Sequence, residues 1–280
     1  MATYKEDVGT AVTNYAGNNP AAVKGELWYD STNKDFKYQY PALTSAGSWR
    51  SGANLNTGRV RLSSAGLYTT ALAIGGEVSD NVGNTELYNG TSWTELNDLT
   101  TARKGQGSAG TPTSALAYGG NDPGGDVAVT EEWNGTNWTE VNDLTTARRD
   151  LGGAGTNAEA CLGFGGQETP GAQSAKTELW NGTNWTEVND LNTARNYLGG
   201  LGSTTAALAF GGDPSGTGAT EEWNGASWVE VADLNTSRYL LAGSSTSSTE
   251  GLAFGGNSPP VTAATEEWSG SSNTIKVLSD

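Results

Sequence analysis

The sequence predicts an all-β fold, a β-propeller, because a short apolar pattern that ends in a glycine pair occurs five times, always followed by the same turn and strand signals. Successive glycine pairs lie 44, 46, 46 and 44 residues apart, a period typical of propeller blades. The pairs are Gly75-Gly76, Gly119-Gly120, Gly165-Gly166, Gly211-Gly212 and Gly255-Gly256. Glycine accounts for 40 of the 280 residues, mostly between short apolar runs, which indicates many tight corners.

Residues 191–234 illustrate how one repeat divides into four strands. The first, at 197–202, is glycine-rich, as expected where backbones come close to a central axis. The second, at 206–210, is apolar throughout and should be buried on both faces. The third, at 220–223, ends in an Asn-Gly pair, which predicts a type I′ hairpin with positive φ at both residues. The fourth strand, from Trp228, alternates apolar and polar residues, as an outer strand should.

The segment before the first complete repeat reads as the outer half of a blade, with a strand, a turn and a strand in residues 25–40. We therefore expect an extended N-terminal anchor at 1–24, a β-hairpin or partial blade at 25–54, and a propeller at 55–280. Five four-stranded blades with the hairpin at the seam of the ring are favoured, and a sixth, partial blade is the alternative. The last repeat lacks a second tryptophan over residues 271–278.

Charge and hydropathy limit the partners that this chain can have. It carries 15 Lys and Arg against 31 Asp and Glu, a formal charge of -16, which repels a phosphate backbone. No apolar run is long enough to span a membrane, and residues 1–25 lack the apolar stretch of a signal peptide. We expect neither nucleic-acid binding nor membrane insertion.

The chemistry expected of most enzymes is missing from this composition. There is no histidine, so imidazole general bases and metal ligands are absent, and with one cysteine no Cys/His zinc site can form. We expect no enzyme activity, no metal and no cofactor. Two carboxylates suffice for a glycosidase, which leaves that alternative open. One glutamate recurs at the same strand position in every repeat. Because a catalytic pair needs one special place, this recurrence favours a structural role over a catalytic one. The residues are Glu86, Glu131, Glu178, Glu221 and Glu266.

An arginine also recurs at the start of each repeat. In four repeats an aspartate precedes it, and both charges flank the link, the short segment from the outer strand of one blade to the inner strand of the next. Their expected role is to satisfy backbone groups of the link. In a closed ring the arginines would also form a circle on one face, and such a circle could hold an anion. These residues are Arg59, Arg103, Arg148, Arg195 and Arg238.

Function in a propeller is expected in the loops that differ between blades. The segments between each glycine pair and the next Thr-Glu vary in length and are rich in polar residues, which suits hydrogen bonding to sugars or to another protein. They carry the candidate binding residues Asp80, Asn81, Asn121, Asp122, Asp126, Gln167, Glu168, Asp213 and Asn257. No Asp-x-Asp-x-Asp spacing among them supports calcium binding.

The order of glycine pair, aromatic residue, tryptophan and Leu-x-x-x-Arg resembles the kelch repeat over residues 55–280, which implies a propeller but no particular function. The start Met-Ala-Thr-Tyr-Lys, the Gly-Glu-Leu-Trp-Tyr-Asp hairpin and the Asn-Gly-Thr-x-Trp-Thr-Glu repeats are similar to virion and tail-fibre proteins of bacteriophages, particularly phages of marine bacteria.

This second resemblance implies a non-enzymatic virion structural protein, in a tail fibre, a decoration or a baseplate-associated position. We expect it to be made in the host cytoplasm, to contact other virion proteins through its N-terminal segment, and to offer its loops to a host-surface glycan or a neighbouring virion protein. The alternatives are a cellular kelch-type protein-interaction module and a carboxylate-based glycan hydrolase.

Overall fold

The computed structural model describes residues 52–67, 69–214, 216–244, 247–258 and 261–270, together with the backbone of three short strands before them. The chain divides into two compact units, Met1–Ser51 and Gly52–Asp280. In the first unit β1 (Thr13–Tyr15), β2 (Leu27–Asp30) and β3 (Asp35–Tyr38) form one sheet. β2 and β3 pair antiparallel within the predicted hairpin, and β1 pairs parallel to β2 inside the segment expected to be an extended anchor.

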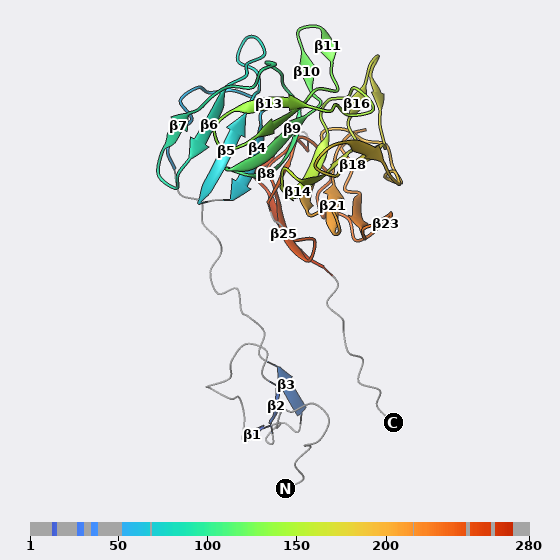
Figure 1. Ribbon diagram of the computed structural model, residues 1–280. Coiled ribbons are helices and arrows are strands. Elements are labelled where there is room, and N and C mark those ends of the chain that lie inside the picture. Colours follow the sequence, from blue (N-terminus) through green and yellow to red (C-terminus); the bar gives the residue numbers. More distant parts are fainter. Residues whose placement is uncertain are drawn as a thin grey trace. The chain divides into compact units, whose positions relative to one another are not determined.

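The second unit is a five-bladed β-propeller, as the repeat predicted (Figure 1). Blade 1 contains β4 (Ser63–Leu67), β5 (Thr70–Ile74), β6 (Thr85–Tyr88) and β7 (Trp93–Glu95). Blade 2 contains β8 (Gly107–Thr111), β9 (Ser114–Tyr118), β12 (Thr130–Trp133) and β13 (Trp138–Val141). Blade 3 contains β14 (Gly152–Asn157), β15 (Ala160–Phe164), β18 (Thr177–Trp180) and β19 (Trp185–Glu187).

Blade 4 contains β20 (Gly199–Gly202), β21 (Ala207–Phe210), β22 (Thr220–Trp223) and β23 (Trp228–Glu230). Blade 5 contains β24 (Ala242–Ser244), β25 (Glu250–Phe254) and β26 (Thr265–Ser269) within the described residues. Its outer strand, expected at 271–278, lies outside them. Two small hairpins, β10 (Asn121–Asp122) with β11 (Gly125–Asp126) and β16 (Gln167–Glu168) with β17 (Ala172–Gln173), extend the loops.

The first strands of all five blades surround one central channel of about 350 Å³, so the blades circle a common axis. Glycine allows the inner strands to approach each other closely, as the sequence predicted. A Cβ on Gly200 would lie 2.6 Å from the carbonyl oxygen of Gly153 in the neighbouring blade, closer than atoms can pack.

The hydrophobic core lies between neighbouring blades. The second strands are buried almost throughout, as predicted. In blades 2 to 4 the fourth strand buries its tryptophan and exposes the next two residues, so it is half-exposed, but the predicted alternation is wrong. At the junction of blades 2 and 3, Tyr118 packs against Trp185, with ring centroids 4.8 Å apart. Because Trp185 belongs to the outer strand of one blade and Tyr118 to the second strand of the other, this contact joins the two sheets.

The Asn-Gly hairpins join the third and fourth strands, but the predicted type I′ turn is wrong. In blade 2 the strands pair at Trp133 and Trp138, which leaves a four-residue loop. Gly135 has a φ of 92°, whereas Asn134 is not among the residues with positive φ. The Asn134 side chain instead accepts hydrogen bonds from the N–H groups of the second and third residues that follow it, 3.0 and 2.9 Å long. This Asx turn bends the chain without a left-handed asparagine.

No helix that could cross a membrane occurs in the described part of the chain.

Candidate functional site

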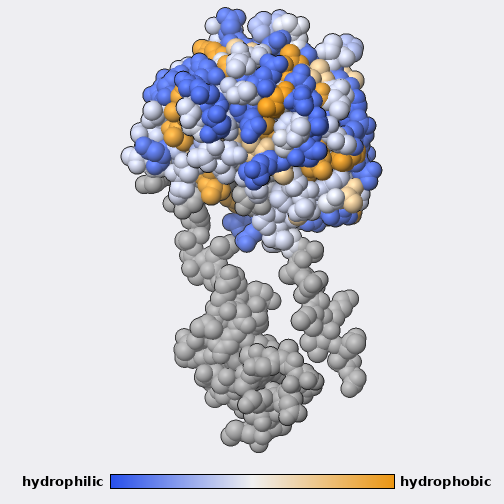
Figure 2. Space-filling view, in the orientation of Figure 1, coloured by the Kyte–Doolittle hydropathy of each residue, from blue (hydrophilic) through white to orange (hydrophobic). Residues whose placement is uncertain are grey.

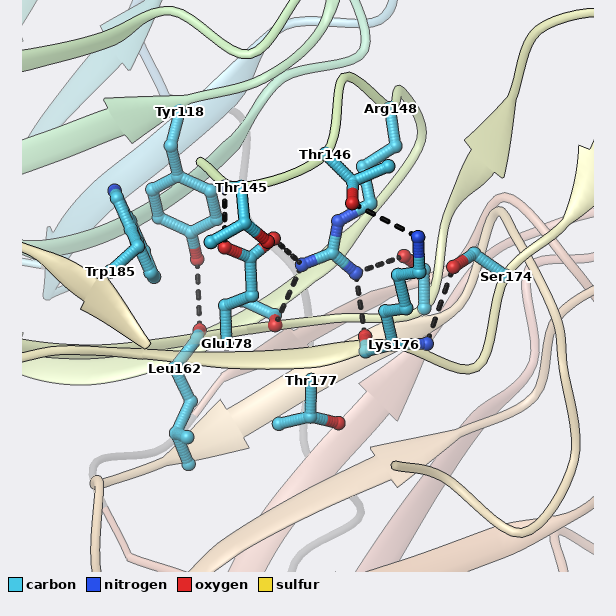
Figure 3. Close-up of polar contacts among 12 residues, drawn as sticks. Tyr118, Thr145, Thr146, Arg148, Leu162, Ser174, Lys176, Thr177, Glu178 and Trp185 are labelled. Carbon is cyan, nitrogen blue, oxygen red and sulfur yellow. Dashed lines mark hydrogen bonds and ion pairs between the residues drawn. The ribbon is translucent and has the colours of Figure 1, made fainter. Parts of the chain in front are cut away.

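Each blade contains the same arginine–glutamate ion pair, and blade 3 shows its geometry (Figure 3). Arg148 Nη2 lies 3.0 Å from Glu178 Oε1, and neither side chain is exposed to solvent. The guanidinium also donates to the carbonyl oxygens of Gly165 and Lys176. Burial lowers the pKa of Arg148 and the charge of Glu178 opposes this effect, so the guanidinium stays protonated. The five pairs are Arg59–Glu86, Arg103–Glu131, Arg148–Glu178, Arg195–Glu221 and Arg238–Glu266.

The glutamate of each pair also holds the link that enters its blade. Glu178 Oε2 accepts a hydrogen bond of 2.7 Å from the backbone N–H of Thr145, which lies in the link just before Arg148 (Figure 3). The repeated glutamates are therefore bound inside the blades.

The aspartate of the link accepts a hydrogen bond from a backbone N–H group and does not pair with the arginine that follows it. Asp143 Oδ1 accepts a 3.1 Å hydrogen bond from the N–H of Thr130, at the start of β12, and Asp98, Asp190 and Asp233 do the same in their blades. Aspartate and arginine are close in sequence but satisfy different backbone groups. The arginine and the glutamate each occur at one fixed position in all five repeats, and this shared pattern is the sequence signal that could have revealed their pairing.

The five arginines of the candidate anion ring all have side chains with no solvent exposure. Each is held by a glutamate and by main-chain carbonyl oxygens of its own blade. Arg59 and Arg103 also donate to a carbonyl oxygen of their link, as the sequence analysis expected, but the carbonyl groups that all five arginines bind belong to the second strands. An anion would have to compete with a buried carboxylate for each guanidinium.

The variable loops lie on one face of the propeller, which we call the loop face and define by residues 77–84, 121–129, 167–176, 213–219 and 257–264. Its small hairpin β10–β11 stands at the top of Figure 1, and the corresponding surface in Figure 2 is largely hydrophilic. Every loop is bridged to the link that enters its blade: Val60 to Glu77, Lys104 to Asn121, Arg149 to Gln167, Asn196 to Asp213 and Tyr239 to Asn257. Loops and links thus form one continuous surface.

Neighbouring loops are tied together by several of the predicted binding residues. Asn81 donates to the carbonyl oxygen of Asn121 at 2.8 Å, and Gln173 donates to Asp213 Oδ2 at 3.1 Å. Thr169 donates to Asp126 Oδ2 at 2.7 Å. These contacts join four successive blades across the loop face, so it presents a connected polar surface.

Asp126 is the most heavily bonded of the predicted residues. Besides Thr169, it accepts hydrogen bonds from Asn121 and Arg149. Burial opposes the ionisation of Asp126, but these hydrogen bonds and the charge of Arg149 outweigh burial and lower its pKa. Its carboxylate therefore fixes the loop of blade 2 against the link and loop of blade 3.

The remaining predicted residues have local roles. Asp80 is exposed. Asp122 accepts from the N–H groups of two glycines in its own turn, and Gln167 accepts from Arg149 at 2.7 Å. Glu168 accepts from Ser174 at 2.8 Å, and Asn257 donates to the hydroxyl of Tyr239 at 2.9 Å. In the part of the chain that the structure describes, no three His, Cys, Asp or Glu residues come together as a metal site.

Sequence reasoning missed a ring of left-handed residues at the centre of the loop face. It consists of Arg61, Gly105, Asp150, Tyr197 and Leu240, with φ values of 53°, 62°, 57°, 54° and 56°. The N–H of each residue from Gly105 onwards donates to the carbonyl oxygen of the member before it, over 2.6 to 3.0 Å. This left-handed ring forces four non-glycine residues into a conformation that costs about 1–2 kcal/mol each. Nothing in the sequence around these five different residues signals it.

The side chains of the left-handed ring place a charged and aromatic cluster at that centre. Arg61 Nη2 lies 2.7 and 2.8 Å from the two carboxylate oxygens of Asp150, which connects blade 1 to blade 3. The guanidinium stands 5.8 Å from the ring centroid of Tyr197, whose ring lies 6.3 Å from that of Tyr239. Burial raises the pKa of Asp150, and the hydrogen bonds from Arg61 act in the opposite direction.

This cluster offers a binding surface of mixed character. Arg61 is 26% exposed and Asp150 is 3% exposed, so the guanidinium is the accessible partner. An arginine beside aromatic rings can donate hydrogen bonds to hydroxyl or carboxylate oxygens while the rings stack on an apolar sugar face or a peptide side chain. A comparison with protein-family models finds no match for this chain, and a comparison with curated proteins finds none either.

Proposed function

We propose that this chain is a non-enzymatic structural protein of a bacteriophage virion that presents its loop face to a host-surface glycan or to a neighbouring virion protein. The kelch and phage resemblances of the repeats and of the N-terminal hairpin motivate the proposal. One structural observation carries the binding part of it: the repeated charged residues are bound inside the blades, whereas the polar groups that differ between blades gather on the loop face.

The interlocked loops support a binding role over catalysis. Asn81, Asp126 and Asp213 are held by contacts from neighbouring loops, so a partner would meet a surface that is already ordered and would lose little conformational entropy on binding. The recurrent glutamates of blades 1 to 3 are paired with arginines inside the blades, so they are not available as the carboxylates of a hydrolase.

The virion assignment is tested on purified phage particles from the source of this sequence. We expect an antibody against the propeller to label intact particles and mass spectrometry to find the chain after the particles are banded and washed. Its absence from washed particles would rule the assignment out and favour a cellular interaction module.

The binding assignment is tested with the purified chain and host cells. We expect the chain to compete with phage adsorption, and we expect Arg61→Ala and Asp80→Lys to weaken that competition. Thr183→Lys, in an exposed hairpin turn away from the loop face, is the matched control. If Thr183→Lys weakens competition as strongly as Asp80→Lys, the loop face is not the binding surface.

A further inference from the structure

The left-handed ring is strained at four of its five positions, although the fold does not require that strain. Gly105 has the same conformation as the other members, with a φ of 62°, and glycine adopts it without steric cost. The other four members carry side chains whose Cβ makes this conformation unfavourable. They are Arg61, Asp150, Tyr197 and Leu240. Strain that glycine would remove indicates that these side chains are retained for a purpose other than the path of the backbone.

An ion pair explains only part of the ring. A Cβ on Gly105 would lie 2.5 Å from Asp150 Oδ1 and 3.2 Å from Arg61 Nη2, so glycine leaves the space in which these two side chains meet. Their contact joins blades 1 and 3 and gives both residues a structural role. It does not explain Leu240, which is 51% exposed and therefore gains little from burial to offset its steric cost.

Arg61 keeps hydrogen-bond donors that the described part of the chain does not use. Its Nη2 donates to both carboxylate oxygens of Asp150, whereas Nη1 donates to no described residue and is not among the buried atoms. The neighbouring Arg149 differs, because both of its terminal nitrogens donate, one to Asp126 and the other to Gln167. The guanidinium of Arg61 thus offers open N–H groups at the centre of the loop face.

Aromatic and aliphatic side chains share this centre with the guanidinium. The guanidinium stands 5.8 Å from the centroid of the Tyr197 ring, which lies 6.3 Å from the Tyr239 ring. Both tyrosines are half-buried, and the exposed Leu240 directly follows Tyr239. Tyrosine presents a carbon surface together with a polar hydroxyl. The cluster therefore places hydrogen-bond donors next to carbon surface, and a sugar ring has the matching hydroxyl oxygens and C–H faces.

The charge of the cluster favours a neutral ligand over an acidic one. Asp150 already neutralises Arg61, at 2.7 Å, and the whole chain carries a formal charge of -16. A ligand carboxylate on Nη1 would share the guanidinium with the Asp150 carboxylate, and two like charges at one site repel each other. A hydroxyl oxygen accepts from the same N–H groups without that repulsion.

We propose that the centre of the loop face binds a neutral sugar residue. A sugar oxygen accepts a hydrogen bond from Arg61 Nη1, and the C–H groups of the sugar ring contact Tyr197 and Leu240. That this sugar belongs to a host-surface glycan rests on the function proposed above. The strain of the ring is then retained because glycine at these positions would remove the groups that contact the sugar.

A protein segment is the competing ligand. Val60, Val78 and Val261 on the loop face are exposed and would suit an apolar partner. Single exposed aliphatic residues are ordinary on protein surfaces, however. The open guanidinium beside two phenol rings matches a ligand that has both hydroxyl groups and carbon surface. The observations therefore favour the sugar, and a protein partner is one outcome of the test.

Titration of the full ¹⁵N-labelled chain, followed by nuclear magnetic resonance, tests the choice of ligand. The probes are methyl glycosides in matched pairs, glucose with glucuronate, galactose with galacturonate and mannose with mannuronate, so that each pair differs only in the carboxylate. We expect a neutral member to shift the amide signals of Arg61, Tyr197 and Leu240, with a Kd about tenfold or more below that of its acidic partner. The signal of Thr183, in an exposed hairpin turn, should not move.

The inference is overturned if the acidic member of a pair binds as tightly as the neutral one. It is also overturned if no neutral sugar of the panel shifts these signals.

Two variants separate sugar binding from stability. Leu240→Gly removes strain and sugar contact together, so its urea midpoint should equal or exceed that of the unchanged chain while its Kd rises about fivefold or more. Arg61→Lys keeps a positive charge for Asp150 but removes Nη1, and its Kd should rise about tenfold. Val229→Ala, at a residue 50% exposed on β23, is the matched control and should change neither value. Unchanged sugar binding in Leu240→Gly or in Arg61→Lys would sink the proposal.

The adsorption assay described above distinguishes this inference from the proposed function. If the chain competes with phage adsorption but binds no neutral sugar, its ligand is a protein or an acidic glycan, and only the inference is lost. If neutral sugars bind through Arg61 and the chain does not compete, the sugar site stands and the role in adsorption is lost.

Discussion

The hydroxyl of Tyr118 in blade 2 donates a hydrogen bond of 3.0 Å to the carbonyl oxygen of Leu162 in blade 3. The ring reaches this carbonyl by passing over Gly153 of the neighbouring inner strand, where an added Cβ would lie 2.2 Å from the hydroxyl oxygen. Burial raises the pKa of Tyr118 well above its usual range, so the phenol remains a donor. The glycine at 153 thus makes space for a contact between blades.

We expect Gly153→Ala to lower the free energy of unfolding by about 1–3 kcal/mol, because the extra methyl group overpacks the junction. Urea denaturation measures the change. Gly58→Ala is the matched control, since a Cβ there would meet no atom within 4 Å. Adding Tyr118→Phe to Gly153→Ala should recover part of the loss, because it removes the oxygen that clashes. Equal effects of the two glycine substitutions would contradict this explanation.

We expect Glu178→Gln to destabilise the propeller by about 3–5 kcal/mol, because it leaves the buried charge of Arg148 without its counter-charge. Thermal and urea unfolding monitored by tryptophan fluorescence measure the loss. Glu187→Gln removes the charge of an exposed glutamate on β19 and should change the stability little. If both variants unfold at the same urea concentration, the buried pair does not stabilise blade 3 as proposed.

The Asp126 carboxylate should make the stability of the loop face depend on pH. Its pKa is lowered in the folded state, so its contribution is present above the unfolded value of about 3.9 and is lost as pH falls through the lower folded value. The difference in unfolding free energy between the unchanged chain and Asp126→Asn should therefore shrink as the pH drops below about 4. Asp122→Asn, in the same loop, should show a smaller difference. A difference for Asp126 that stays constant from pH 7 to the acid limit would refute this role.

The thiol of Cys161 should be unreactive in the folded protein. It is fully buried and donates to the carbonyl oxygen of Asn157 at 3.0 Å, and burial raises its pKa, so almost no thiolate forms at neutral pH. We expect modification by a chromogenic disulfide reagent to follow global unfolding in urea. A cysteine introduced by Thr183→Cys at an exposed turn should react at once. Rapid reaction of Cys161 in native buffer would contradict the buried placement.

The sequence predicted much of this fold for a simple reason. Strand positions follow from local alternation and from glycine, and a period near 45 residues repeats the same local pattern until the blades close a ring. The buried second strands and the half-exposed outer strands followed from such patterns. The turn at Asn134 did not, because the asparagine side chain satisfies the loop without a positive φ.

The candidate site was predicted only in outline. The loop face was expected from the segments that differ between repeats, but its contacts join residues that lie about 40 positions apart, such as Asn81 with Asn121 and Asp126 with Thr169. Local pattern carries no information on partners at such separations. The role of the loops in binding a glycan or a virion protein stays a prediction.

By itself, the sequence determined the order of the strands in a blade and the face on which the loops differ, and it favoured five blades over six, because each of these depends on short-range patterning repeated at a fixed period. Only the tertiary structure decided that Arg148 binds Glu178 and not Asp143, and that Arg61 reaches Asp150 across the centre of the loop face. Those choices depend on distances between strands and blades, and such distances exist only after the ring of sheets has formed.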